Sequence, residues 1–114
     1  MTTVRAARAH DVPDRPPIRL AAGQPVHVGE RDTTWPAFVF VTTGDGAGWV
    51  PARHIDTGSS PPVMFAPYDT TELPTSAGDV LTVIARDDPS GWTWVRGHDG
   101  REGWVPNDTI DPIG

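Results

Sequence analysis

The side chains best suited to chemistry in this sequence are two histidines that have acidic neighbours. His10 directly precedes Asp11, and His54 lies two residues before Asp56. An imidazole titrates near neutral pH and readily ligates metal ions, and a nearby carboxylate can orient its ring. A protein metal site, however, draws on three or four ligands, and no third ligand accompanies these histidines. We therefore expect no metal site.

Candidate nucleophiles are equally isolated. Ser59 and Ser60 lie in a Gly/Ser/Pro stretch, Ser76 and Ser90 lie in predicted loops, and the chain has no cysteine. Nucleophilic catalysis requires a base beside the hydroxyl and a third group that holds the base. A glycine-rich phosphate-binding loop is also missing from the sequence. We predict that the protein is not an enzyme and uses no cofactor.

Composition narrows the possible partners. The net charge is −6, and the nine basic residues are all arginines scattered among acidic ones. Nucleic-acid binders usually carry a basic stripe, so we expect neither nucleic acid nor an anionic membrane as partner. No apolar run is long enough for a signal peptide or for a span of about 20 residues. We therefore expect a cytoplasmic protein, and the Arg-only, Ala/Gly/Pro-rich composition suggests a bacterial source.

The chain contains an internal repeat. The sequence Gly-Trp-Val-Pro occurs at residues 48–51 and again at 103–106, and an Ile-Asp pair follows each copy at the same distance. Repeats of this kind indicate duplicated structural units. A Gly-Ser-Ser-Pro-Pro stretch between the halves has the composition of a short linker. We predict a first domain at 4–57, a linker at 58–62 and a second domain at 63–113.

Each half is typical of short β-strands. Apolar and polar residues alternate after Gly23 and after Gly78, which is the pattern of half-buried strands. Asp-Gly pairs at 45–46 and 99–100 predict hairpin turns. Pro51 and Pro106 should end their strands, since proline cannot donate to a ladder. The single turns that follow, at 52–55 and 107–110, are interpreted as 3₁₀ turns, and the fold class is all-β.

The second half resembles a Src-homology 3 (SH3) domain over about 50 residues. The resemblance rests on these motifs: Ala66-Pro67-Tyr68-Asp69, Glu72-Leu73, Gly78-Asp79-Val80, Gly91-Trp92-Thr93-Trp94 and Gly103-Trp104-Val105-Pro106-Asn107. The first half is similar through Gly23, Phe38, Phe40 and its own Gly-Trp-Val-Pro. As a whole the chain is similar to small bacterial proteins with two such domains in tandem, which implies two small five-stranded barrels.

The resemblance also implies a binding groove for proline-rich extended peptides, lined by aromatic residues. In the second domain the family positions fall on Tyr68, Trp92 and Pro106, while two tyrosine positions are Thr70 and Thr109. Acidic residues that could pair a ligand arginine are Glu72, Asp87 and Asp88. The corresponding positions of the first domain are His10, Phe38 with Trp35 close by, Pro51 and His54.

These positions favour a non-catalytic interaction module whose proline-peptide groove is partly eroded, with a protein or a proline-containing peptide as partner. Two alternatives remain open. One is an accessory protein that binds a small ligand or metal at His10, Phe38 and His54. The other is a structural module that associates with itself. The chain's own Pro-rich segment at 13–18 could also cover a neighbouring surface.

Overall fold

The computed structural model describes residues 2–113, which form two compact units. Unit 1 combines the described residues up to Asp14 with those from Thr71 onward, and unit 2 is Arg15–Thr70. The ordered elements within residues 2–113 are β-strands and two 3₁₀ turns, as the strand pattern predicts. The predicted division at 4–57 and 63–113 differs from these units. Residues 4–14 belong to unit 1 and not to the first-half unit, and residues 63–70 belong to unit 2 and not to the second-half unit.

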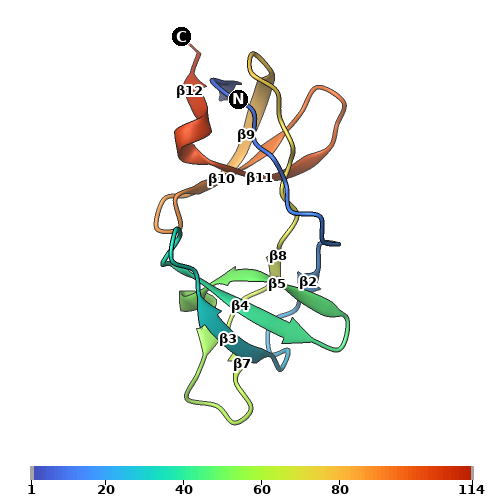
Figure 1. Cartoon of the computed structure of the whole chain (residues 1–114), viewed down its shortest axis with the longest axis vertical. Helices are drawn as coiled ribbons and strands as arrows, with labels where there is room; N and C mark the ends of the chain where they lie inside the picture. The colour runs from blue at the N-terminus through green and yellow to red at the C-terminus, as the bar shows by residue number, and fades with distance from the viewer. Residues whose placement is uncertain (1, 114) are drawn as a thin grey trace. The chain divides into compact units, whose positions relative to one another are not determined.

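Unit 1 is built on a single five-stranded antiparallel sheet (Figure 1). Its elements are β1 (Thr3–Ala6), β9 (Val80–Asp87), β10 (Trp92–Arg96), β11 (Glu102–Pro106), the 3₁₀ turn η2 (Asn107–Thr109) and β12 (Ile110–Pro112). The strand order is β11-β10-β9-β1-β12, so β1 from the start of the chain lies between two strands from its end. A parallel bridge joins Glu72 to Trp104 of β11 at one edge of this sheet, and β12 forms the other edge. As described, the sheet does not show the closed barrel that the resemblance implies.

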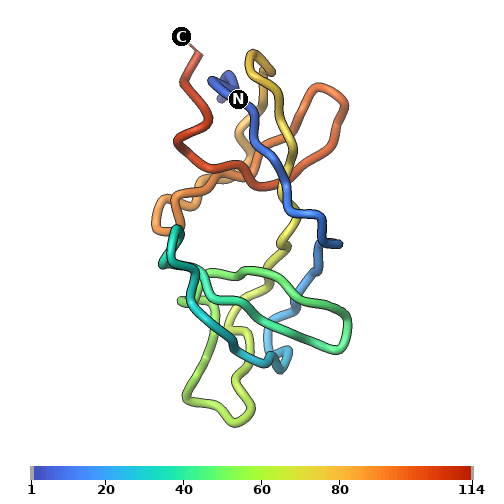
Figure 2. Tube along the Cα trace, viewed as in Figure 1, coloured from blue at the N-terminus to red at the C-terminus, as the bar shows by residue number. Residues whose placement is uncertain are grey.

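Unit 2 holds the other strands in three short antiparallel ladders. Its elements are β2 (Arg19–Leu20), β3 (His27–Arg31), β4 (Phe38–Thr43), β5 (Gly46–Pro51), the 3₁₀ turn η1 (Ala52–His54), β6 (Ile55–Asp56), β7 (Val63–Met64) and β8 (Tyr68–Asp69). The ladders are β3-β4-β5, β2-β8 and β6-β7. The trace of unit 2 is continuous along the chain, from light blue to yellow in Figure 2.

The predicted linker at 58–62 has a different role in the structure. It joins β6 to β7, and these two strands pair with each other inside unit 2, with Ile55 opposite Met64. A hydrogen bond from Gly58 N to Asp56 Oδ1 of 2.9 Å shapes the start of this turn. The chain instead passes between units at 14–15 and at 70–71.

Equivalent backbone hydrogen bonds hold β1 in unit 1 and β7 in unit 2. In unit 1, Ala6 N donates to Asp79 O (2.8 Å) and Gly78 N donates to Ala6 O (2.7 Å). In unit 2, Met64 N donates to Gln24 O (2.9 Å) and Gly23 N donates to Met64 O (2.7 Å). Residues 3–6 therefore do for unit 1 what residues 61–64 do for unit 2. A strand pairs where its backbone hydrogen bonds are satisfied and its apolar face is buried. Proximity in the sequence alone does not determine the pairing partner.

Each unit has its own apolar core, which is formed by alternate residues of its strands. The core of unit 1 consists of Val4, Ala6, Leu73, Leu81, Val95 and Val105. The core of unit 2 consists of Ile18, Leu20, Val26, Val39, Val41, Val50, Ile55 and Met64. Both predicted hairpins are confirmed, and Gly100 adopts φ +87°, a left-handed conformation that favours glycine. The predicted 3₁₀ turns are confirmed as well.

Candidate functional site

A compact group of functional side chains in unit 1 surrounds His10. The His10 Nε2 atom lies 2.9 Å from Glu72 Oε1. The imidazole also meets the Trp92 ring edge to face, with ring centroids 5.4 Å apart and an interplanar angle of 75°. Trp92 in turn lies directly opposite Pro106 across β10 and β11. We name His10, Glu72, Trp92 and Pro106 the His10 cluster.

Backbone pairing fixes the positions of these side chains. His10 exchanges two hydrogen bonds with Thr75, of 3.1 Å from His10 N and 3.2 Å from Thr75 N. The segment that carries Glu72 is pinned to β11, because Leu73 N donates to Trp104 O (3.1 Å) and Trp104 N donates to Thr71 O (2.9 Å). The carboxylate and the imidazole therefore stand on two neighbouring, hydrogen-bonded segments, and the indole comes from the start of β10.

Unit 2 has a corresponding group around Tyr68. The Tyr68 ring meets the His54 ring edge to face, at 5.4 Å between centroids and 85° between planes. Tyr68 lies opposite Leu20 in the β2-β8 ladder, and His54 comes from the 3₁₀ turn η1. Phe38, the first residue of β4, lies opposite Pro51, the last residue of β5. We name His54, Tyr68, Phe38 and Pro51 the Tyr68 cluster.

The structure redistributes the predicted site residues between the units. Of the residues predicted to line the groove of the second domain, Tyr68 lies in unit 2, and Trp92, Pro106 and Glu72 lie in unit 1. Of the residues predicted to line the groove of the first domain, His10 lies in unit 1, and the others, Trp35, Phe38, Pro51 and His54, lie in unit 2. His10 and Tyr68 have exchanged places because the strands that lead into them have done so.

The two predicted acidic residues of the β9–β10 turn differ in position. Asp87 ends β9 directly opposite Trp92, and its carbonyl oxygen accepts hydrogen bonds from Ser90 N and Gly91 N. Asp88 is exposed within the turn. Asp87 therefore borders the His10 cluster by register, and Asp88 belongs to the solvated turn beside it.

The residues of the alternative ligand site at His10, Phe38 and His54 are distributed over both units. His10 belongs to unit 1, whereas Phe38 and His54 belong to unit 2. Within residues 2–113, no group of three or more His, Cys, Asp or Glu side chains is arranged to hold a metal ion. Nor does this part of the chain contain a helix with the length and apolar character to cross a bilayer.

A second aromatic group in unit 1 was not predicted from the sequence. Trp94 and Trp104 face each other across β10 and β11, with ring centroids 5.3 Å apart. Trp94 Nε1 donates to Glu102 Oε1 (2.8 Å), and Arg96 Nη2 lies 2.7 Å from Glu102 Oε2. These donors, the Trp94 indole first and Arg96 second, hold the pKa of the Glu102 carboxyl below its ordinary value. The cross-strand spacing of Arg96 and Glu102 around the predicted hairpin is the signal that would have revealed the pair.

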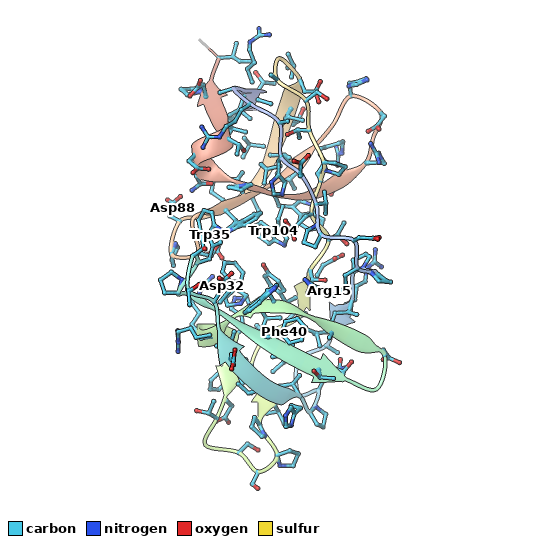
Figure 3. The ribbon with its side chains drawn as sticks, viewed as in Figure 1. Arg15, Asp32, Trp35, Phe40, Asp88 and Trp104 are labelled. Carbon is cyan, nitrogen blue, oxygen red and sulfur yellow. The ribbon has the colours of Figure 1, made fainter. Side chains whose placement is uncertain are left out.

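Unit 2 carries a related aromatic pair at the corresponding strand positions. Phe40 and Trp49 lie opposite each other, with ring centroids 5.1 Å apart. The Arg15 guanidinium lies over the Phe40 ring, 5.4 Å from its centroid (Figure 3). A cation over an aromatic face adds about 0.5–1 kcal/mol at an exposed site. The Phe40–Trp49 pair lies on the face of the β4-β5 ladder opposite to Val41 and Val50, which belong to the core of unit 2.

Comparison with known proteins supports the resemblance for the second half of the chain. Residues 64–113 match the Variant SH3 domain family. The chain is 42% identical over 59 residues to Myosin-1 of Vanderwaltozyma polyspora, covering 46% of this chain and 5% of that protein. It is 40% identical over 48 residues to the SH3 domain-containing protein Dlish of Drosophila melanogaster, covering 42% of this chain and 13% of that protein.

Residues 64–113 are therefore similar to one variant SH3 domain, and SH3 domains generally serve as protein-interaction modules and are typically non-catalytic. The chain spans only a small part of the length of either relative. The matched stretch begins at Met64, yet the structure places residues 64–70 in unit 2. Family order and spatial order therefore differ at the first strand of the domain.

Proposed function

We propose that this chain is a non-catalytic protein-interaction module made of two SH3-like units, and that the His10 cluster of unit 1 binds a proline-containing peptide. The matched SH3 domain supports an interaction role, since SH3 domains bind proline-rich peptides. Such peptides are already extended in solution, so little conformational entropy is lost when they bind. The His10 cluster offers them an indole, a proline and a carboxylate.

The observation that carries the proposal is the convergence of Trp92, Pro106 and Glu72 in one unit. Trp92 and Pro106 lie opposite each other and supply ring surface on which a ligand proline can pack. Glu72 supplies the negative charge that pairs with a ligand arginine, and such pairs can be bidentate and are stronger than neutral hydrogen bonds. We therefore expect the preferred ligand to combine prolines with one arginine.

Unit 2 is the weaker candidate for the same function. It keeps Tyr68 and Pro51, has Phe38 where unit 1 has Trp92, and has His54 from η1 beside its tyrosine. The carboxylate at its periphery, Asp69, already forms an ion pair with Arg19 at 3.1 Å. Where unit 1 offers Glu72 to a ligand, unit 2 offers a carboxylate that its own arginine neutralises.

The test is a titration of the whole chain with synthetic proline-rich peptides, followed by amide NMR. Peptides that carry one arginine should shift signals of His10, Glu72 and Trp92 at micromolar to millimolar concentration. Trp92→Ala should abolish these shifts. Phe65→Ala is the matched control, because Phe65 is the most exposed large apolar residue among residues 2–113 and belongs to unit 2. Equal binding by wild type and Trp92→Ala, or no binding by any peptide in the panel, would refute the proposal.

A further inference from the structure

His10 and Glu72 form a pair that is largely withdrawn from solvent. Their side chains are 11% and 23% exposed, and Nε2 and Oε1 are 2.9 Å apart. The carboxylate that should receive a ligand arginine is therefore already in contact with an imidazole, a side chain that is able to carry a positive charge. In the related cluster of unit 2 the corresponding position is Tyr68, which carries no such charge.

We propose that His10 is a specificity-determining residue that controls the arginine preference of the His10 cluster through pH. This inference rests on the proposed peptide-binding function and assigns its regulation. When His10 is protonated, its positive charge cancels that of Glu72 and repels a ligand guanidinium. When His10 is neutral, Glu72 keeps its full negative charge and selects arginine.

The hydrogen-bonding capacity of the two groups explains why the contact need not be broken. A neutral imidazole still donates one Nε2–H bond to Glu72 in the appropriate tautomer, which removes no charge from the carboxylate. A carboxylate has about four acceptor sites, so a guanidinium can bind to those that remain. The switch is therefore one of charge, and the backbone bonds between His10 and Thr75 stay as they are.

The other charged groups around His10 do not reverse the sign of this effect. On its own segment, Asp11 is exposed, and Arg8 pairs with Asp108 of η2 at 3.1 Å. From the neighbouring segment Glu72 faces it, and from β10 the Trp92 ring, which does not titrate in this range. Asp87 of β9 lies opposite Trp92 and adds negative charge to the same region. Among these groups, Glu72 is the one in direct hydrogen-bond contact with the His10 imidazole, so a proton on His10 acts first on that carboxylate.

The expected effect is modest but measurable. An imidazolium about 5 Å from an incoming guanidinium weakens binding by about fivefold to tenfold even when bound solvent screens the interaction strongly. The affinity for an arginine-containing peptide should therefore rise by that factor between pH 5.5 and 8. A ligand without a positive charge should be indifferent to the same pH change.

The experiment compares two synthetic peptides with capped ends and no histidine, identical except that one carries arginine and the other its neutral isostere citrulline. Their dissociation constants are measured with the whole chain from pH 5.5 to 8. Wild type should bind the arginine peptide about five to ten times more tightly at pH 8 and the citrulline peptide equally throughout. His10→Gln should bind the arginine peptide tightly at every pH. His98→Gln, at an exposed turn of the same unit, should behave as wild type.

A ligand-free measurement separates failure of this inference from failure of the proposed function. The ¹³C signal of the Glu72 carboxyl should show a titration step between about pH 5.5 and 8 that His10→Gln lacks. If that step is present and no peptide binds, the proposed function fails and the charge coupling stands. If the step is absent, or if the arginine peptide binds with the same pH profile to wild type and to His10→Gln, the inference is wrong. Should His10→Gln not fold, Glu72→Gln provides the second variant, and it should bind the arginine peptide weakly at every pH.

Discussion

Replacement of Met64 by alanine tests which unit the segment 63–70 completes. Met64 is 1% exposed and is the largest fully buried side chain in the part of the chain that the structure describes. It belongs to the core of unit 2, together with Leu20, Val41 and Val50. Truncation of a buried methionine to alanine costs about 2–5 kcal/mol, because transfer energy is lost and a cavity remains. Unit 2 should lose this amount of stability, and unit 1 should lose little.

Amide hydrogen exchange on the whole chain can distinguish the two units. Strand β4 is hydrogen-bonded on both sides in unit 2, and β10 holds the same place in unit 1. A loss of 2 kcal/mol lowers protection by about 30-fold, since each tenfold corresponds to 1.36 kcal/mol. In Met64→Ala, protection of the β4 amides should therefore fall by at least about 30-fold, while that of the β10 amides changes little.

The reciprocal variant is Val4→Ala, which truncates a side chain that is 1% exposed in the core of unit 1. It should weaken the β10 amides and spare those of β4. If Met64→Ala instead weakened β10 and spared β4, residue 64 would belong with the strands that follow it, as the order of the family predicts. That result would refute the assignment of residues 63–70 to unit 2.

Two further predictions concern the close approach beside β11 and the charge of Glu102. A Cβ on Gly103 would lie 2.7 Å from Leu73 N, so Gly103→Ala should push away the segment bearing Glu72 and cost about 2–4 kcal/mol in denaturant unfolding. Gly48→Ala meets only the Thr70 side chain at 3.1 Å and should cost under about 1 kcal/mol; similar losses for both variants would contradict this account. Trp94→Phe removes the indole donor, so the pKa of Glu102, measured by NMR, should rise toward its ordinary 4.5. Because the pKa of Glu102 is lowered in the fold, its stabilising effect is present above pH 4.5 and is lost as the pH falls, and the variant should show a smaller loss in acid.

The local structure could be predicted from the sequence because it depends on short-range signals. Alternation around Val39 and Val95 and the Asp-Gly pairs specify strands and hairpins. Prolines 51 and 106 end β5 and β11 as expected. The equivalence of His10 and Tyr68 could also be predicted, since both positions pair with the same place in their units, Thr75 in one and Leu20 in the other.

The sequence does not predict in the same way which unit contains β1 and which contains β7. The segments that end at Ala6 and Met64 make equivalent backbone hydrogen bonds, so periodicity allows either segment in either unit. The choice depends on whether a small or a large side chain fits the core, and this requires the three-dimensional packing. The contact between His10 and Glu72 follows from that choice, because the two residues are far apart in sequence and meet only when residues 3–14 complete unit 1.

The most direct test of the central claim is a disulfide trap, and the chain contains no cysteine that would interfere. Arg5 lies directly opposite Val80 in the β1–β9 ladder, within the range that a disulfide can bridge. The double variant Arg5→Cys with Val80→Cys should form the bond in monomeric protein, as judged by thiol counting on size-selected material. The matched pair Val63→Cys with Val80→Cys should stay reduced. A bond between positions 63 and 80, with positions 5 and 80 left unbridged, would show that Tyr68 and not His10 accompanies Trp92, and would contradict the account.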